Sequence, residues 1–412
     1  MSTPIDRASD PFDPRSRAFR VDPYPAYDFL RRHSPVHQRP EKNDWLVSRY
    51  SDVVALLKDP RLGYARPPGQ ETLSNAGAGP YKALLERTLR AQHLWLNFQE
   101  PPDHTRIGML LQGTFHPDNR SSLRARLQLL ADRHLDRALD RGRMDVVNDL
   151  AGPVTSTIIC DIVGVPEGAR RKLEHLTREI HYLLDVDQTQ IGRDRGMLAM
   201  MALTELVHQL ISGRRRQGKV DDDLISVLLR AESEGQISEV EVLAQCSMVL
   251  VVGQINSKLL ISNGAFTLLK NQDKLRALRA RPDLLDSAIN ELLRFETPTQ
   301  VVSRHALEDV QVNGTLIRKG ENVRLLIGSA NRDPEAFVDP DVLDITRAPN
   351  LHVSFGHGVH YCLGAMLARL EAHVTIGTLL RRLPSIRFAE AEAEWEDMFV
   401  MRGLRSLPVV FG

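Results

Sequence analysis

The chain has 412 residues, of which 42% are hydrophobic and 26% are charged, and its 53 basic residues balance its 53 acidic residues. That length is enough to bury a large core. A formal net charge of zero gives no electrostatic reason to expect nucleic acid or an acidic membrane surface as a partner, so small-molecule chemistry is favoured.

The N-terminal segment and the cysteines bear on localisation. Residues 1–27 are polar and proline-rich, and no later stretch approaches the ~20 consecutive apolar residues that a membrane-spanning helix needs. The three cysteines, Cys160, Cys246 and Cys362, are far apart and lack CxxC spacing, so neither a disulfide framework nor a zinc site is predicted. We therefore expect a cytoplasmic protein that binds neither membrane nor nucleic acid.

The first part of the chain predicts short elements of both kinds. Apolar spacing predicts a helix over residues 25–33, a strand at 45–47 and a helix that includes 53–57. Residues 67–79 are rich in Gly, Pro, Ser and Asn, which is typical of a loop. Nearly every segment between 121 and 270 has helical periodicity, so the middle of the chain is predicted to be helical.

The longest predicted helix lies at the end of that region. Ser238 and Glu241 form a capping-box sequence, and no proline follows before about Leu269. A further helix should start after Pro282 and stop before Pro298. A β-rich stretch should follow, with strands at 300–305, 310–312, 315–318 and 322–327 and tight turns at Asn313-Gly314 and Lys319-Gly320.

The segment from Phe355 to Gly364, F-G-H-G-V-H-Y-C-L-G, carries the clearest chemical signal. Its glycines permit a tight loop, and the helical pattern that follows, which ends near Arg381-Arg382, places Cys362 at a helix N-terminus. Backbone N–H groups and the helix dipole there favour a thiolate, and a thiolate ligand promotes O–O cleavage at haem iron. A lone cysteine beside a glycine turn could equally be a buried core residue.

The full string resembles the haem-binding loop of the cytochrome P-450 superfamily, F-G-x-G-x-H-x-C-x-G, with every fixed position occupied. Three more segments resemble this family in the right order: P-P-D-H-T-R at 101–106, E-L-L-R at 291–294 and N-R-D-P at 331–334. The resemblance implies a mainly α fold with a smaller β portion, formed by one domain over residues 1–412. It also implies haem b between the long central helix and the cysteine loop, with Cys362 as the axial iron ligand.

The resemblance further implies roles for individual residues. His104, Arg304 and His360 occupy positions that hold the haem propionates, which need cationic or hydrogen-bonding partners, although each could instead be a solvated residue. Gly108 stands where the family usually has another arginine, so one propionate partner is missing. By family position, the remaining haem contacts are Phe355, Cys362 and Gly364. Glu291, Arg294 and Arg332 occupy the positions of a buried structural ion-pair network.

The central helix departs from the family pattern. The family usually reads A/G-G-x-D/E-T-T, a kink beside the iron followed by an acid and an alcohol that relay protons, whereas this chain reads V-G-Q-I-N-S at 252–257. Gly253 should keep the kink, but Ile255 cannot exchange a proton and the amide of Asn256 is a poor general acid. The candidate catalytic residues are Gly253, Gln254, Asn256 and Ser257, and Lys258 is expected to face away from haem.

Two interpretations of this departure stay open. In the first, Ser257, an ordered water or a substrate hydroxyl takes over the relay in an ordinary hydroxylase. In the second, the reaction needs no ordinary relay, as in oxidative ring coupling, nitration or peroxide-driven oxidation.

The resemblance implies oxidation of a small organic substrate by monooxygenation in bacterial secondary metabolism, with electrons from a separate ferredoxin or flavodoxin. A haem-binding sensor or carrier would also keep the cysteine loop. A hydrolase that uses Ser354 and His357 is disfavoured because no G-x-S-x-G occurs there.

Family positions also predict the residues that line the substrate pocket. They are Trp95, Leu96, Val249, Val301, Val302, Phe399 and Val400.

Overall fold

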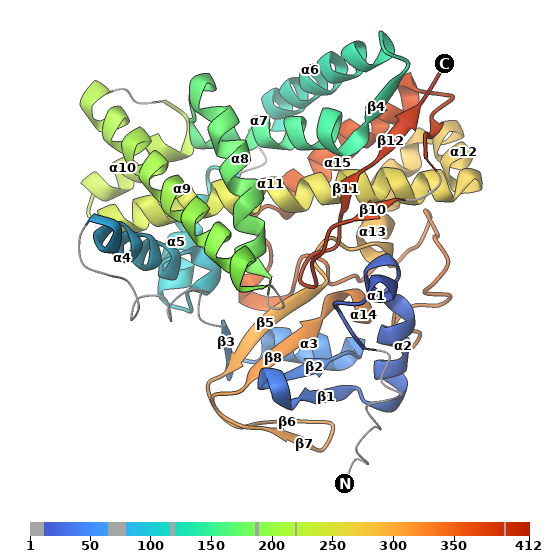
Figure 1. Cartoon of the computed structure of the whole chain (residues 1–412), viewed down its shortest axis with the longest axis horizontal. Coiled ribbons are helices and arrows are strands. Elements are labelled where there is room, and N and C mark those ends of the chain that lie inside the picture. The colour runs from blue at the N-terminus through green and yellow to red at the C-terminus, as the bar shows by residue number, and fades with distance from the viewer. Residues whose placement is uncertain (1–11, 65–79, 116–119, 186–188, 219–220, 391–392) are drawn as a thin grey trace.

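The protein is described by a computed structural model over residues 12–64, 80–115, 120–185, 189–218, 221–390 and 393–412. The loop expected at 67–79 lies outside these ranges. Helices dominate and strands form a smaller part, so the expected fold class is confirmed. Figure 1 shows the helices gathered around the long helix α11 (Glu239–Lys270), with the main sheet on one side of them.

The main sheet has five strands in the order β1-β2-β8-β5-β3. Strands β2 and β8 pair in parallel, and the other neighbours pair antiparallel. The register places Arg304 of β5 opposite Tyr64 of β3. The strands are β1 (Val36–Arg39), β2 (Asp44–Val47), β3 (Leu62–Tyr64), β5 (Val301–Ala306) and β8 (Asn322–Leu326).

Short helices lie beside this sheet, and the predicted helix at 25–33 is confirmed as α2 (Figure 1). They are α1 (Arg17–Val21), α2 (Tyr24–His33), η1 (Pro40–Lys42), α3 (Tyr50–Lys58) and α14 (Ile327–Ala330).

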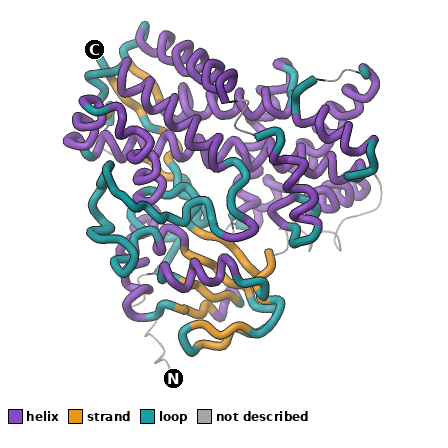
Figure 2. The backbone as a smooth tube through the Cα atoms, turned by 180° about the vertical axis from the view of Figure 1, so that it is seen from behind, coloured by secondary structure: helices purple, strands orange, loops and turns teal. Residues whose placement is uncertain are grey.

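Helix α11 is the centre of the helical part, and it packs against α4, α7, α9, α13 and α15. Its start is confirmed, because Ser238 accepts a hydrogen bond from the N–H of Glu241 and the Glu241 side chain accepts one from Ser238. Figure 2 shows the same helical layer from behind. The other helices are α4 (Pro80–His93), η3 (Leu96–Phe98), α5 (Asp103–Gln112), α6 (Arg120–Leu139), η5 (Val146–Ala151), α7 (Gly152–Val163), α8 (Glu167–Leu184), α9 (Gln190–Gln217), α10 (Leu224–Ser233), α12 (Gln272–Ala280), η6 (Pro282–Leu284), α13 (Leu285–Phe295), η7 (Gly358–His360) and α15 (Ala365–Arg382).

Three small sheets complete the fold. The predicted hairpin of β6 and β7 turns at Asn313 and Gly314, whose φ values of 49° and 76° suit a tight left-handed turn. The sequence did not predict the C-terminal strands, which are two or three residues long and, unlike β6 and β7, are not joined by an Asn-Gly turn. The strands of these sheets are β4 (Arg143–Asp145), β6 (Val310–Val312), β7 (Thr315–Ile317), β9 (Arg387–Phe388), β10 (Glu394–Trp395), β11 (Leu404–Ser406) and β12 (Pro408–Val410).

Two segments are long and apolar enough to cross a membrane by length and composition, contrary to the expectation that none is. They are Val146–Val163 and α11, and most of the residues in each are buried inside the protein. That burial is typical of a core helix that is apolar on all sides because other helices surround it.

Candidate active site

The cysteine loop connects η7 to α15. Gly356 and Gly358 have φ values of 72° and 73°, in the left-handed region that favours glycine. A Cβ on Gly358 would also lie 3.2 Å from the carbonyl oxygen of Leu57. The backbone N–H of Cys362 donates to the carbonyl of Phe355 at 2.9 Å, which closes the loop. The glycine pattern therefore forms the tight loop that the sequence predicted.

Polar contacts anchor this loop to the helices behind it. The Ser354 hydroxyl donates to the Leu293 carbonyl at 2.7 Å and accepts from the Asn331 side chain at 2.9 Å. Asn331 also accepts from the backbone N–H of Val353. Ser354 thus holds the loop in place, and its engaged hydroxyl gives no support to a hydrolase.

The three cysteines differ in exposure. Cys160 and Cys246 are buried, whereas Cys362 is exposed. The Cys362 thiol is nevertheless surrounded closely enough that desolvation raises its pKa, while the N–H of Gly364 and the charge of Arg369 lower it. Desolvation therefore opposes the thiolate that the helix N-terminus favours, and a bound metal ion would supply positive charge that stabilises the thiolate.

A cluster of cationic and aromatic side chains forms around His360. Its Nε2 lies 3.1 Å from a carboxylate oxygen of Glu100, and its ring centroid lies 4.6 Å from that of His104. The buried guanidinium of Arg304 lies 4.6 Å from the centroid of the Tyr64 ring, which in turn contacts His360 edge-on. The three residues predicted to hold the propionates therefore come together, from α5, β5 and η7.

The pKa shifts in this cluster follow from burial and from the contact between His360 and Glu100. Burial, and then the charge of His360, lower the pKa of His104. Burial alone would raise the pKa of Glu100, but hydrogen bonds from His360 and from the N–H of Tyr64 outweigh it and lower that pKa. The Nδ1 atom of His360 is buried without a hydrogen-bond partner among the described residues. A buried polar atom of this kind normally has one, so a ligand group or water fits there.

Helix α11 presents different side chains to different neighbours. It is helical throughout its length, so the kink expected at Gly253 does not interrupt it. A Cβ on Gly253 would lie 2.6 Å from Ile159, so this glycine instead allows α7 to approach closely. Lys258 lies beside Gly152, which begins the same helix α7.

One face of α11 is left open. Val252 is 37% exposed in a helix that is otherwise mostly buried. One turn later, the Asn256 side-chain oxygen accepts a hydrogen bond from the Thr299 hydroxyl at 3.2 Å. Gln254 lies on a different face, where it accepts from Thr177 of α8 at 3.3 Å. The side chains of Gln254 and Asn256 therefore point in different directions, against the expectation that both line one site.

The predicted pocket residues are mostly core residues. Trp95 is buried and stacks on Phe98, and Leu96, Val249 and Val302 pack into core clusters, whereas Val400 is partly buried. Phe399 lies in an aromatic cluster with Phe12 and Phe19, and Val301 belongs to the same cluster. The side chains of Phe399 and Val301 therefore contribute to the packing of the N-terminal helices on the sheet.

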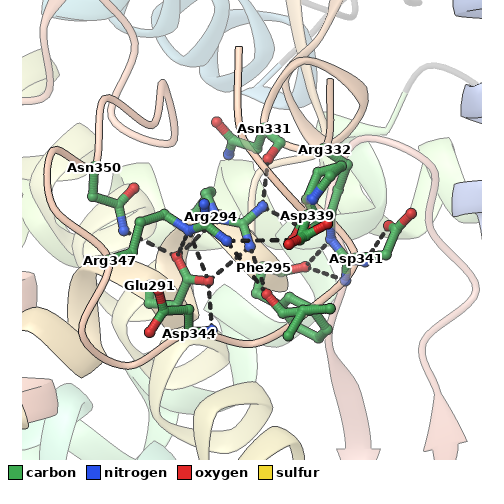
Figure 3. Close-up of polar contacts among 12 residues, drawn as sticks. Glu291, Arg294, Phe295, Asn331, Arg332, Asp339, Asp341, Asp344, Arg347 and Asn350 are labelled. Atoms are coloured by element: carbon green, nitrogen blue, oxygen red, sulfur yellow. Dashed lines mark hydrogen bonds and ion pairs between the residues drawn. The ribbon is translucent and has the colours of Figure 1, made fainter. Parts of the chain in front are cut away.

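A buried ion-pair network lies behind the cysteine loop (Figure 3). Arg294 donates to both carboxylate oxygens of Glu291, at 2.7 and 2.8 Å, and neither side chain is exposed. A second arginine, Arg347, pairs with Glu291 at 3.1 Å. The side-chain amide of Asn350 also donates to the Glu291 carboxylate, at 3.0 Å. Arg332 was expected in this place, but it donates to the Phe295 carbonyl and to Asp341 instead.

Sequence reasoning missed Glu100, Arg347 and Thr299. Glu100 directly precedes the P-P-D-H-T-R segment, so its position was a usable signal. Arg347 and Thr299 lie outside every motif, and only the folded chain brings them to Glu291 and Asn256.

The thiol at a glycine loop, the imidazole and guanidinium cluster and the long helix together fit a haem-thiolate protein. A model of the cytochrome P-450 family matches residues 76–386, and the chain belongs to this family. When bound, haem supplies the activation of molecular oxygen, with Cys362 as the ligand that the family motif assigns.

Relatives of the family cover nearly the whole chain. The biotin biosynthesis cytochrome P-450 of Bacillus subtilis is 36% identical over 96% of this chain and 98% of its own length. The monooxygenase PikC of Streptomyces venezuelae is 35% identical, over 95% of this chain and 91% of its own. A crystal structure of P-450BioI with a hexadec-9Z-enoic acid ligated acyl carrier protein has a TM-score of 0.88 and 35% identity, over 96% of this chain and 99% of the other. These relatives support an oxidoreductase of the monooxygenase type rather than a haem sensor or carrier.

Proposed function

We propose that this cytochrome P-450 inserts oxygen into a small organic molecule of bacterial secondary metabolism, in the cytoplasm, with electrons from a separate ferredoxin or flavodoxin. The observation that carries the proposal is the exposed Cys362 thiol within a complete cysteine loop, while the other two cysteines are buried. The open face of α11 at Val252 offers an apolar surface, as substrate pockets usually do.

The substrate class is proposed from relatives whose names share one chemistry. They include the polyketide biosynthesis cytochrome P-450 PksS of Bacillus subtilis, 32% identical over 97% of this chain, and the P-450BioI complex with an acylated carrier protein. A polyketide-derived or fatty acyl chain, free or bound to a carrier protein, is therefore the class to test first.

A spectral binding screen tests this function. Purified haem-loaded protein should show a substrate-induced spin shift with acyl chains, acylated carrier protein or macrolides, and smaller shifts with aromatic, peptide and terpenoid compounds. A hit should then yield an oxygenated product when ferredoxin, its reductase and NAD(P)H are supplied. A bound compound that is never oxidised under these conditions would contradict the proposal.

Haem anchoring by Arg304 gives a quantitative prediction. If Arg304 holds a propionate, Arg304→Ala should weaken haem retention by about 1.5–3 kcal/mol, the range for a hydrogen bond to a charged group. Arg324→Ala on the neighbouring strand is the control, because Arg324 pairs with Asp44 at 3.0 Å instead. Haem transfer to an excess of an apo-globin acceptor measures the loss rate. Equal rates for the two variants would refute the role.

An atypical reaction is the second candidate, and the Asn256–Thr299 contact favours it. At this position the family alcohol is replaced by an amide that is held by a hydroxyl at 3.2 Å. Such an amide orients a substrate or water but does not transfer a proton readily.

The variant Asn256→Thr tests the importance of this amide. We expect it to change product identity, or the fraction of NAD(P)H that ends in product, severalfold, with the thiolate spectrum unchanged. Thr299→Val is the control, because it removes the hydroxyl and leaves the amide. If Asn256→Thr alters neither product nor peroxide release, position 256 is remote from the chemistry.

A further inference from the structure

One position beside the cluster around His360 departs from the family pattern. Gly108 lies on α5 one turn after His104, where the family usually has an arginine that pairs with a haem propionate. A Cβ on Gly108 would meet no heavy atom of the described residues within 4 Å, and its φ is not in the left-handed region. Neither the backbone nor the described neighbours therefore require a glycine there, and the cluster has lost a cationic donor.

The charges that remain do not make up for this loss. Arg304 supplies one buried guanidinium, but Glu100 brings a carboxylate to within 3.1 Å of His360. Haem carries two propionates, and a carboxylate buried without a cation or a hydrogen-bond donor costs free energy. A further donor close to Arg304 and His360 would offset this cost.

The ring of Tyr64 is held at that place. Tyr64 ends β3 and is paired in register with Arg304 of β5, whose guanidinium lies 4.6 Å from the centroid of the Tyr64 ring. The ring contacts His360 and Phe98 edge-on, at centroid distances of 5.4 and 5.3 Å. The backbone N–H of Tyr64 donates to Glu100 at 2.8 Å, and the same carboxylate contacts His360. These contacts fix the phenol beside two of the residues assigned to the propionates.

The hydroxyl of Tyr64 is unused within the part of the chain that the structure describes. The hydroxyls of Tyr24, Tyr27 and Tyr50 each donate a hydrogen bond, whereas that of the half-buried Tyr64 has no partner there. On the neighbouring ring, the Nδ1 atom of His360 is buried and also lacks a partner. Buried polar atoms normally have partners, so two unused polar groups on adjacent rings indicate a polar ligand. A phenol hydroxyl can donate to a carboxylate.

We propose that the Tyr64 hydroxyl donates a hydrogen bond to a haem propionate and replaces the arginine that is missing at position 108. A neutral donor then takes the place of a cation, so this propionate is held by a hydrogen bond without an ion pair from α5. The inference concerns retention of the cofactor, and its test needs neither a substrate nor turnover.

Haem loss from Tyr64→Phe tests the donor directly, because this variant keeps the ring and removes only the hydroxyl. Transfer of haem to an excess of an apo-globin acceptor should be at least about tenfold faster than from the wild type, the effect of losing a hydrogen bond to a charged group. Tyr50→Phe is the matched control, because its hydroxyl donates to the Leu351 carbonyl at 2.8 Å instead. Equal loss rates for Tyr64→Phe and the wild type would overturn the proposal.

Gly108→Arg tests whether the tyrosine replaces the arginine. If both groups serve the same carboxylate, Gly108→Arg should slow haem loss much more in the Tyr64→Phe background than in the wild type, because their effects are then coupled. The same slowing in both backgrounds would show that the two groups act independently, and the replacement would be wrong.

Haem dimethyl ester separates propionate binding from a purely structural role of the hydroxyl. Both propionates are esterified in this cofactor and carry no charge, so the ratio of loss rates between Tyr64→Phe and the wild type should fall towards one. A hydroxyl that only stabilises β3 would give the same ratio with haem and with its dimethyl ester. That outcome would overturn the proposal even if Tyr64→Phe lost haem quickly.

Discussion

Cys362→Ala should abolish the far-red-shifted Soret band that reduced haem-thiolate proteins show with carbon monoxide, and should abolish oxygenation with it. The physical reason is that the thiolate is the electron-donating axial ligand, and alanine offers no donor atom. The absorption spectrum of reduced, carbon monoxide-treated protein measures the outcome directly.

The other two cysteines provide matched controls for this experiment. Cys160 and Cys246 are buried, and burial raises the pKa of Cys160 to about 11, so neither is available as a thiolate ligand. Cys160→Ala and Cys246→Ala should keep the band, although each removes some core packing. A haem-loaded wild-type protein with only a histidine-type band would show that Cys362 is not the ligand.

The elements that the sequence predicted are those with strong local signals. Helix α11 follows its capping box at Ser238, and the turn at Asn313-Gly314 follows from two residues that accept positive φ. The cysteine loop was predictable for the same reason, since its glycines, its cysteine and the following helix lie within one short stretch. Local chemistry of this kind does not depend on the rest of the chain.

The residues that the sequence missed depend on long-range packing. Arg347 reaches Glu291 from 56 positions away, and Thr299 reaches Asn256 from 43 positions away. The sequence also could not predict which face of α11 is exposed, because a helix that is apolar on all sides has no amphipathic stripe. For the same reason the sequence could not separate Phe399, a core residue, from Val252, whose side chain is exposed.

The ion-pair network behind the loop shows that the role of a short sequence motif can depend on where the fold places it. An E-x-x-R spacing alone describes an ordinary pair on a helix surface. Here neither partner is exposed, and Arg294 also donates to the carbonyls of Asn331 and Pro340, at 2.8 Å each. Asn331 in turn holds the Ser354 segment of the cysteine loop, so the network connects α13 to the haem ligand's loop.

Glu291→Ala should therefore destabilise the holoprotein by about 3–5 kcal/mol, the usual cost of removing one partner of a buried ion pair. The loss is large because two arginines, Arg294 and Arg347, would keep their charges in a poorly solvated interior without the carboxylate. Urea unfolding followed by the haem absorption and by circular dichroism measures this cost.

Asp341→Ala is the control for that variant. Asp341 pairs with Arg332 at 2.8 Å, but its side chain is 73% exposed, so its removal should cost no more than about 1 kcal/mol. The loss of stability in Arg347→Ala should lie between the losses in Glu291→Ala and Asp341→Ala, because Glu291 would keep Arg294 and Asn350 as partners. Equal stability of Glu291→Ala and Asp341→Ala would show that water reaches Glu291, and that the network does not hold the cysteine loop through a buried charge.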